Sequence, residues 1–508
     1  MAGTPIPMAK RLNILFLMAD QLAAAFLPAY GQKVVKSPNI DALAEKGVVF
    51  DSFYCASPLC APSRFTMMAG AAVSRIGAYD NAAEFASEVP TFAHYLRASG
   101  YRTALAGKMH FCGPDQLHGF EERLTTDIYP ADFGWTPDWE HPEIRPSWYH
   151  NMGSVTESGP CVRSNQLDFD DEVTYAARRH IYDLARSSEG RPFCLTVSWT
   201  HPHDPYANLP ELFDLYRDDD IPMPSVQAGD VPLDPHSARL RHVSDMDNYT
   251  ITDADIRRAR RAYFSSVSYF DRQVGIMLQA LKESGLEDDT VVVLTADHGD
   301  MLGERGLWYK MNWFENACRI PLIISAPGKF KPGRIAGSAS HLDLLPTLAE
   351  IAGPFEPAAP IDGRSLLGAL SGGQGHDEAI GEYCGEGAIA PLVMIRRAQW
   401  KFAHTPSDPD QLYDLKADPL EKQNLAADPK HAETVAAFRA EVKQRWDLAK
   451  LKDQVIDSQR RRRIVYEALA KGKHRSWDYQ PIRDAGTSYM RNNVVLDDLE
   501  ARTRLPRV

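Results

Sequence analysis

Several short, mostly apolar runs of residues constrain the fold of this chain more than any other feature. The clearest lie at 13–18, 101–106, 192–199 and 290–295, and each ends in polar residues. A strand that is buried on both faces of a parallel sheet has such a continuous pattern, whereas a half-exposed strand alternates. Helical patterns lie between the runs, and the longest is at 256–284. The sequence therefore predicts an α/β fold in which a large, mostly parallel central sheet is flanked by helices.

The residues that directly follow these runs carry groups suited to a binding site. Asp20 follows the first run, and Lys108 and His110 follow the second. Asp297 and His298 follow the run at the end of the series. Ligands of open α/β sheets bind beyond the carboxyl ends of the strands, so these side chains can meet there. A carboxylate beside an imidazole suits a divalent metal, although caps, turn acids and solvated lysines explain each residue taken singly.

A short helical pattern begins at the segment Leu-Cys-Ala-Pro-Ser-Arg, residues 59–64. A thiol at a helix N-terminus lies in the positive field of the backbone amides, and the fixed charge of Arg64 adds to that field. The field favours an anion at Cys60. A buried structural cysteine next to a helix-starting proline explains the segment equally well, so the residues alone leave both interpretations open.

The order of these segments along the chain resembles the sulfatase family of the alkaline-phosphatase-like superfamily. The similarity rests on the segments at Cys60, Lys108 and Asp297, extends over nearly the whole chain, and is strongest to the choline sulfatase branch. It implies an alkaline-phosphatase-like sandwich and a smaller C-terminal domain with an antiparallel sheet. The expected parts are a catalytic domain (1–375), a small sheet-and-helix domain (376–452) and a C-terminal extension that contacts another subunit (453–508).

The resemblance also implies a mechanism. Cys60 is oxidised after translation to formylglycine (3-oxoalanine), and one hydroxyl of the aldehyde hydrate attacks the sulfur of a sulfate ester. The second hydroxyl lets the sulfated intermediate collapse, with His110 as the base. A divalent metal, Ca²⁺ in preference to Mg²⁺ or Mn²⁺, takes part as a Lewis acid. The implied metal ligands are Asp20, Gln21, Cys60, Asp297 and His298, and the implied sulfate-binding residues are Arg64, Lys108, His201 and Lys310.

Two positions depart from the common family pattern. Gln21 stands where many sulfatases have a second aspartate, so it can offer a metal only a neutral oxygen. His298 stands where many have asparagine, and this variant is similar to the choline sulfatase and phosphonate monoester hydrolase branches. Of the two histidines that follow the run at 192–199, we assign the family position to His201 and a structural role to His203.

The substrate that the resemblance implies is choline O-sulfate, which would be hydrolysed to choline and sulfate. Its quaternary ammonium has no hydrogen to donate, so its recognition needs aromatic faces and carboxylates. The aromatic-rich stretch at 127–151 is similar to choline sulfatases and unlike other sulfatases. The predicted substrate contacts are Trp135, His150, Asn151, Glu386 and Asp497.

Charge and cysteine content limit the other partners. The net charge of −12 argues against nucleic-acid binding, despite the arginines at 460–463. Seven scattered cysteines do not indicate a disulfide framework. The apolar run at 12–19 is too short to cross a membrane, and no cleavage site follows it. We expect a cytoplasmic enzyme without membrane contact. The resemblance further implies a formylglycine-generating or other sulfatase-maturing enzyme as a partner, and a homotetramer.

Two other functions stay open. A phosphonate monoester or phosphodiester hydrolase, or a promiscuous sulfatase of the same superfamily, would share the Cys60 segment and the Asp297-His298 pair. A catalytically inactive binding protein is the remaining alternative. The stretch at 127–151 and the C-terminal tail favour choline sulfate over phosphonate, and relative turnover of the two ester classes separates them.

Overall fold

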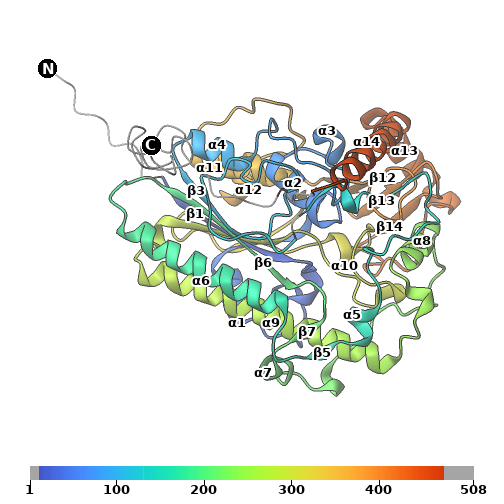
Figure 1. The fold of residues 1–508 in the computed structure, drawn as a ribbon, viewed down its shortest axis with the longest axis horizontal. Coiled ribbons are helices and arrows are strands. Elements are labelled where there is room, and N and C mark those ends of the chain that lie inside the picture. The colour runs from blue at the N-terminus through green and yellow to red at the C-terminus, as the bar shows by residue number, and fades with distance from the viewer. Residues whose placement is uncertain (1–10, 130, 474–476, 478–508) are drawn as a thin grey trace, which may run out of the picture.

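A large sheet runs through the centre of the protein (Figure 1). The computed structural model describes residues 11–129, 131–473 and 477. Within them the sheet has eight strands. In order across the sheet they are β10 (Gly333–Ser340), β2 (Val48–Tyr54), β9 (Leu322–Ser325), β8 (Thr290–Ala296), β1 (Asn13–Asp20), β6 (Phe193–Pro202), β3 (Arg102–Gly107) and β4 (Glu122–Arg123).

Helices cover both faces of this sheet, as the sequence predicts (Figure 1). One layer contains α1 (Pro38–Lys46), α6 (Asn165–Arg186) and α9 (Asp253–Glu283). The other contains α2 (Cys60–Ala69), α4 (Phe92–Ala98), α11 (Leu344–Ala352) and α12 (Leu367–Leu370). The apolar positions predicted for the longest helix, such as Tyr263, Phe270 and Met277, are all fully buried. A capping box between Thr252 and Asp255 starts that helix.

The register of the central strands brings the predicted site residues to one edge. β1 lies between β8 and β6 and runs parallel to both. Ala19 pairs with Ala296, so Asp20 and Asp297 leave the sheet side by side. β3 is also parallel to β6, and this pairing ends at Gly107, directly before Lys108. Gly107 has a φ of +103°, and a Cβ there would lie 1.9 Å from a neighbouring backbone oxygen, so only glycine fits this turn.

The sheet is mostly parallel, and β9 is its exception. β9 pairs antiparallel with both β8 and β2, whereas the other pairings in the sheet are parallel. After β8 the chain stays at the site edge through residues 297–321 and enters β9 from that edge. This return explains why the mostly apolar stretch at 320–325 forms a strand of opposite direction.

A second, antiparallel sheet follows in the C-terminal part of the chain. Its strands are β11 (Ala379–Tyr383), β12 (Leu392–Arg397), β13 (Trp400–His404) and β14 (Gln411–Asp414). Apolar residues of this sheet and of α13 (Ala432–Arg445) form a separate core that includes Val393, Phe402 and Phe438. The sequence pattern predicts three of these strands and misses β11. A long helix, α14 (Leu448–Leu469), comes after α13.

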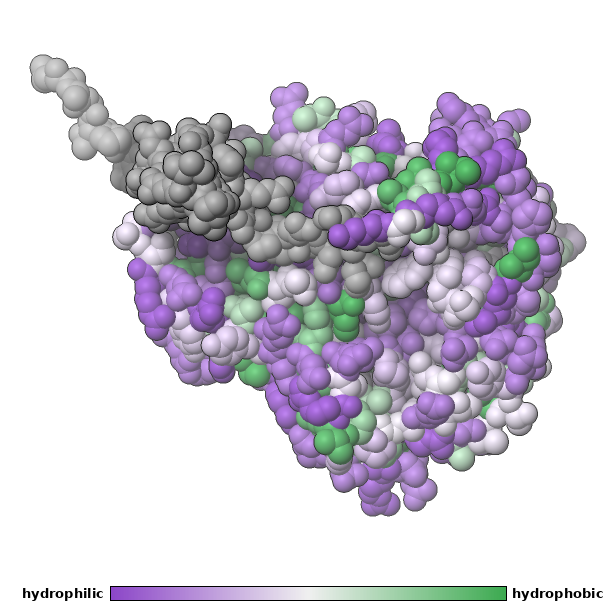
Figure 2. Space-filling view, in the orientation of Figure 1, coloured by the Kyte–Doolittle hydropathy of each residue, from purple (hydrophilic) through white to green (hydrophobic). Residues whose placement is uncertain are grey.

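Short elements connect these layers. They are α3 (Val73–Ile76), η3 (Phe133–Trp135), α5 (Gly153–Thr156), β5 (Gly159–Pro160), β7 (Ala207–Asn208), α7 (Pro210–Phe213), α8 (Pro235–Val243) and α10 (Glu315–Cys318). None of the described helices combines the length and the apolar character needed to cross a lipid bilayer. On the face shown in Figure 2, hydrophilic residues dominate and hydrophobic ones form small separate patches. All seven cysteines are free thiols, as their scattered positions predict.

Because β1 is the strand around which the site edge is built, its core residues should dominate stability. Leu15 is fully buried, whereas Leu420 is 43% exposed. We expect Leu15→Ala to lower the free energy of unfolding by about 2–5 kcal/mol, the usual cost of a cavity in a packed core. Leu420→Ala, the matched control, should change it by about 0.5 kcal/mol or less. Urea unfolding followed by tryptophan fluorescence measures both, and equal effects would contradict this view of the core.

Candidate active site

Cys60 is the first residue of α2, so the predicted helix start is confirmed. The backbone oxygen of Leu59 accepts the first helical hydrogen bond from the Ser63 amide, at 2.9 Å. Cys60 itself is 3% exposed. Burial would raise the pKa of its thiol, but the positive charges of Lys108 and Lys310 lower it well below 9.0.

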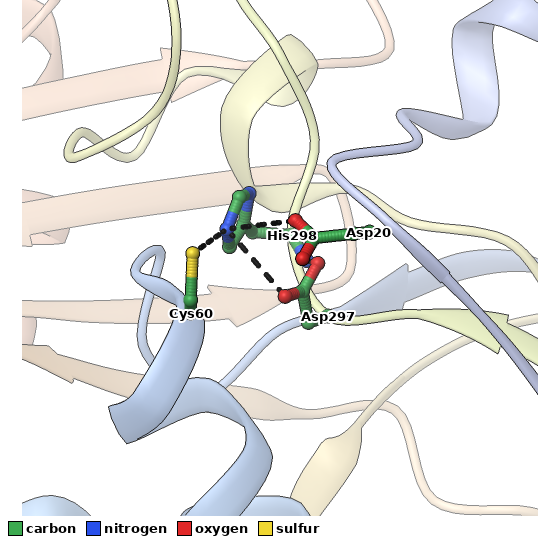
Figure 3. A group of neighbouring side chains, drawn as sticks. All are labelled: Asp20, Cys60, Asp297 and His298. Carbon is green, nitrogen blue, oxygen red and sulfur yellow. Dashed lines mark hydrogen bonds and ion pairs between the residues drawn. The ribbon is translucent and has the colours of Figure 1, made fainter. Parts of the chain in front are cut away.

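Four side chains from three separate segments converge at the carboxyl edge of the sheet (Figure 3). One possible ligand atom from each of Asp20, Cys60, Asp297 and His298 lies within 4.8 Å of the other three, and all four residues are buried. Asp20 Oδ1 has no hydrogen-bond partner among the described residues. A buried carboxylate oxygen without a partner is costly, and a bound cation would satisfy it. The cluster therefore fits a divalent metal.

His298 is oriented for such a role by a bond on its far side. Its Nδ1 lies 3.0 Å from the backbone oxygen of Gly299, which can only accept, so Nδ1 carries the proton. The lone pair of Nε2 then faces the cluster, 3.2 Å from Cys60 Sγ and 3.6 Å from Asp297 Oδ2. Metal-binding histidines are commonly fixed by this kind of bond on the other ring nitrogen.

Arg64 lies among the acids of the cluster and has no surface exposure. Its guanidinium donates to Asp297 Oδ2 at 2.9 Å and to Asp20 Oδ2 at 3.1 Å. It also donates to Ser198 Oγ at 2.8 Å and to the backbone oxygen of Lys108 at 2.5 Å. In this structure the donors of Arg64 are engaged by the two acids and the strand ends, so its expected contact with the sulfate stays a prediction.

Lys108 approaches the same acids from β3. Its ammonium forms an ion pair with Asp20 and lies 4.6 Å from the ring centre of Tyr129. Burial alone would raise the pKa of Asp20, but the charges of Lys108, His203 and Arg64 outweigh it and lower the pKa to about 2. Asp20 is thus ionised across the neutral range, as a metal ligand must be.

The side chain of Gln21 bridges protein groups. Its amide oxygen accepts from Lys310 Nζ at 2.6 Å, and its amide nitrogen donates to Asp300 Oδ2 at 2.8 Å. The structure therefore gives the amide oxygen of Gln21 a protein partner, and Gln21 positions Lys310 beside the cluster. Its backbone amide also donates to Asp297 Oδ1 at 2.9 Å.

A cavity of about 400 Å³ opens directly above Cys60. It brings together most of the substrate contacts predicted from the sequence, namely Trp135, His150, Asn151 and Glu386. His110 and Lys310 also line it. Neither ring nitrogen of His110 has a hydrogen-bond partner within the described part of the chain, so this imidazole is available to a ligand. Asp497, the remaining predicted contact, lies outside the described residues.

The structure places His201 and His203 in different surroundings. His201 Nδ1 is bonded to Asp170 at 2.6 Å, and its ring packs against Tyr269 away from the cavity. His203 lines the cavity instead, and its Nε2 lies 2.9 Å from Lys310 Nζ. This difference in placement has a physical cause. Asp170 on α6 bonds the first histidine, and nothing in the sequence near the strand end indicates that contact.

Other residues of the site carry no clear sequence signal. Asp127 accepts hydrogen bonds from the backbone amides of Met109 and His110, both at 2.9 Å, and so fixes the Lys-Met-His segment. Tyr309 stacks on His150 with ring centres 4.4 Å apart. Asp127 belongs to the aromatic-rich stretch that the sequence analysis singled out, and this was the one signal that could have found it.

Comparison with known proteins decides the family. The Sulfatase family model matches residues 12–354, well over half of the chain. The chain belongs to the sulfatase family. It is accordingly a hydrolase of sulfate esters. Two further models match the C-terminal part of this sulfatase: N-sulphoglucosamine sulphohydrolase, C-terminal, at 303–447, and Choline sulfatase enzyme C terminal at 453–505.

Individual relatives agree with the family. This sulfatase is 48% identical to the choline-sulfatase of Rhizobium meliloti (strain 1021), over 97% of this chain and 98% of that protein. It is 27% identical to the multifunctional alkaline phosphatase superfamily protein PehA of Trinickia caryophylli, over 84% of this chain and 94% of that protein. The phosphonate monoester hydrolase structure of Agrobacterium radiobacter matches with a TM-score of 0.71 at 25% identity, over 88% of this chain and 96% of that one. The predicted resemblance and fold class are both confirmed.

The different surroundings of His201 and His203 allow a matched test of which histidine contributes to catalysis. Asparagine can keep the donor that a histidine Nδ1 provides, but it has no group at the Nε2 position. We expect His203→Asn to lower kcat/KM for a sulfate ester by roughly 10- to 100-fold, the worth of a hydrogen bond to a charged group. His201→Asn should retain the bond to Asp170 and change kcat/KM by about threefold or less. Steady-state kinetics on both variants measure this, and a larger loss in His201→Asn would restore the original assignment.

Proposed function

We propose that this sulfatase hydrolyses choline O-sulfate to choline and sulfate. The observation that carries the proposal is the cavity above Cys60, which combines aromatic rings with a buried carboxylate. Among the described residues, this carboxylate has no cationic partner within hydrogen-bonding distance. A quaternary ammonium needs such surroundings, because it can be held only by charge and by π faces. The identity of 48% to a choline-sulfatase, over nearly the full length of both chains, supports the same substrate.

Glu386 supplies the carboxylate. Its side chain is buried, and Oε2 has no hydrogen-bond partner among the residues that the structure describes. Burial, reinforced by the charge of Asp80, raises the pKa of Glu386 to about 8. A cation in the cavity would stabilise the ionised form and repay the cost of burying it. An ester without a positive charge would give no such compensation.

Aromatic rings supply the π faces. Trp135 stacks on Trp148 with ring centres 6.4 Å apart and meets Tyr129 edge-on at 6.1 Å. His150, stacked on Tyr309, stands on the cavity wall with Asn151. The trimethylammonium group would lie among these residues, with the sulfate directed toward Cys60.

The sulfate end would be held by Lys310 and His203, whose nitrogen atoms converge beside Cys60. Formylglycine made from Cys60 supplies, in its hydrated form, a nucleophilic hydroxyl and a second hydroxyl for the release of sulfate. His110 lines the cavity with unengaged ring nitrogens and is the proposed base. Arg64 and Lys108 form ion pairs with the acids of the cluster and hold them in place.

Asp20, Asp297 and His298 would hold the divalent metal, for which we propose Ca²⁺. When bound, the metal supplies positive charge that stabilises the charge developing on the sulfuryl oxygens. A sulfatase-maturing enzyme that converts Cys60, a cytoplasmic location, a homotetramer and the three-part division at 375 and 452 complete the proposal. These rest on the similarity to choline sulfatases.

A neutral ester of the same shape provides the test. In 3,3-dimethylbutyl sulfate a carbon replaces the nitrogen of choline O-sulfate, so that only the charge differs. We expect the wild type to favour choline O-sulfate by about 30-fold or more in kcat/KM, since cation–π and carboxylate attraction both act on the charge. Glu386→Gln should reduce this preference by roughly tenfold through KM, with little change for the neutral ester. Equal turnover of the two esters by the wild type would contradict the choline assignment.

The second candidate is a phosphonate monoester hydrolase, which the structural match with a TM-score of 0.71 favours. The cluster at Cys60 would serve either ester class, because both present a tetrahedral group with anionic oxygens. Turnover of phenyl phosphonate monoesters in the same assay separates the two. We expect kcat/KM for the phosphonate to be about 100-fold lower than for choline O-sulfate, because the phosphonate has no cation for Glu386 and Trp135. The reverse order would favour the second candidate.

A further inference from the structure

The wall of the cavity that carries Trp135 belongs to a long connection, residues 131–151, which we call the wall loop. It holds no β-strand, and its regular structure is the single turn of η3. Such a loop does not fix its own side chains well. α14, from the C-terminal part of the chain, lies against the wall loop and bonds to it at Thr136 and Trp139, just after Trp135. The contacts come from 459–466 of α14, which we call the strap.

The strongest of these contacts is a buried ion pair. Arg462 is 5% exposed and Asp80 is fully buried. The guanidinium of Arg462 donates to both oxygens of Asp80, each at 2.7 Å, and its Nη1 also reaches Thr136 Oγ1 at 3.2 Å. Thr136, which directly follows Trp135, is therefore held by an arginine that is itself fixed in a bidentate ion pair. Bidentate pairs of this kind are geometrically specific.

A second contact continues through the wall loop to Glu386. Gln459, which is fully buried, accepts a hydrogen bond from the backbone amide of Trp139 at 3.0 Å. The indole nitrogen of Trp139 in turn donates to the backbone oxygen of Gly385 at 3.2 Å. Gly385 directly precedes Glu386. The strap is thus linked to both of the groups proposed to recognise the ammonium.

Further contacts enclose the turn that bears Trp135. Gly134 lies against Tyr466, and a Cβ at Gly134 would be 3.0 Å from its ring. Phe133 meets the ring of Trp477 edge-on at 4.8 Å. At the surface, Arg460 and Arg463 form ion pairs with the wall-loop residues Glu140 and Asp138.

These contacts show that the arginine run at 460–463 packs against another part of the same chain. The sequence favoured a solvated or intersubunit helix, and exposed ion pairs alone are worth little. Arg462, however, is buried, and the other two pairs fall on the same loop. Arg461, by contrast, is exposed. The run therefore has an intramolecular partner.

We propose that the strap positions Trp135 and Glu386, which makes Arg462 and Gln459 positioning residues for recognition of the substrate cation. The proposal deepens the choline sulfate assignment and rests on it. It also gives the C-terminal segment a role inside its own subunit, in setting which sulfate esters this enzyme prefers.

The main test variant is Arg462→Lys. Lysine keeps a positive charge beside Asp80, so the buried carboxylate is not left unpaired, but it cannot bind both carboxylate oxygens and Thr136 at once. We expect KM for choline O-sulfate to rise by roughly tenfold, with kcat and both constants for 3,3-dimethylbutyl sulfate changed by about threefold or less. Arg461→Ala, in the same run, is the matched control and should behave as wild type.

A second variant and a second readout keep the test independent of folding and of the substrate. The double variant Arg460→Ala/Arg463→Ala removes only surface pairs, and lysine at both positions should rescue it. Its KM for choline O-sulfate should rise by about threefold. Hydrogen exchange of the peptides covering 133–149 should become faster in it and in Arg462→Lys, and should stay unchanged in Arg461→Ala.

The outcomes separate the two proposals. Unchanged exchange at 133–149, or an equal loss for charged and neutral esters, would overturn the role of the strap. Failure of the wild type to hydrolyse choline O-sulfate would instead overturn the proposed function, and the exchange measurement would still decide whether the strap holds the wall loop.

Discussion

The buried contact of Arg64 with Asp20 and Asp297 is the interaction on which the rest of the site depends. Two carboxylates that leave neighbouring strands side by side repel each other, and burial would raise the pKa of Asp20. The guanidinium compensates them with hydrogen bonds of 3.1 and 2.9 Å. Breaking a buried pair of this kind typically costs about 3–5 kcal/mol, because it leaves an unpaired charge in the interior. A metal at the remaining oxygens would complete the neutralisation.

The chain builds its specificity outward from this centre in layers. The sheet fixes the acids, and the helix that begins at Cys60 brings the reactive residue to them. Around them lie the imidazole and ammonium groups that we propose bind the sulfate. The outermost layer, which includes the wall loop and the strap, would determine which alcohol group of a sulfate ester the enzyme accepts. In this arrangement the outer layer can change without altering the register of the central strands, so a single family fold can serve many sulfate esters.

The sequence could predict the parts of the fold and site that depend on residues close together in the chain, and it could not predict those that depend on distant residues. β1, β8 and the acids after them follow from local patterns, because apolar runs and strand-end residues are neighbours in sequence. Local patterns do not show which of His201 and His203 faces the cavity, because His201 is held by Asp170 on another element, α6. The same holds for Arg462, whose partner Asp80 is 382 positions away, and no pattern within the arginine run indicates it. Gln21 was expected to face a metal, and only the packed structure shows that its oxygen bonds Lys310.

The central claim is that converted Cys60 hydrolyses choline O-sulfate. It is tested most directly by measuring the mass of the peptide that contains Cys60 and the release of sulfate from choline O-sulfate in the same preparation. Oxidation of the thiol to the aldehyde lowers the mass by about 18 Da. The account predicts that sulfate release rises in proportion to the converted fraction across preparations of different maturation. Full release from protein whose Cys60 is entirely unconverted would contradict it.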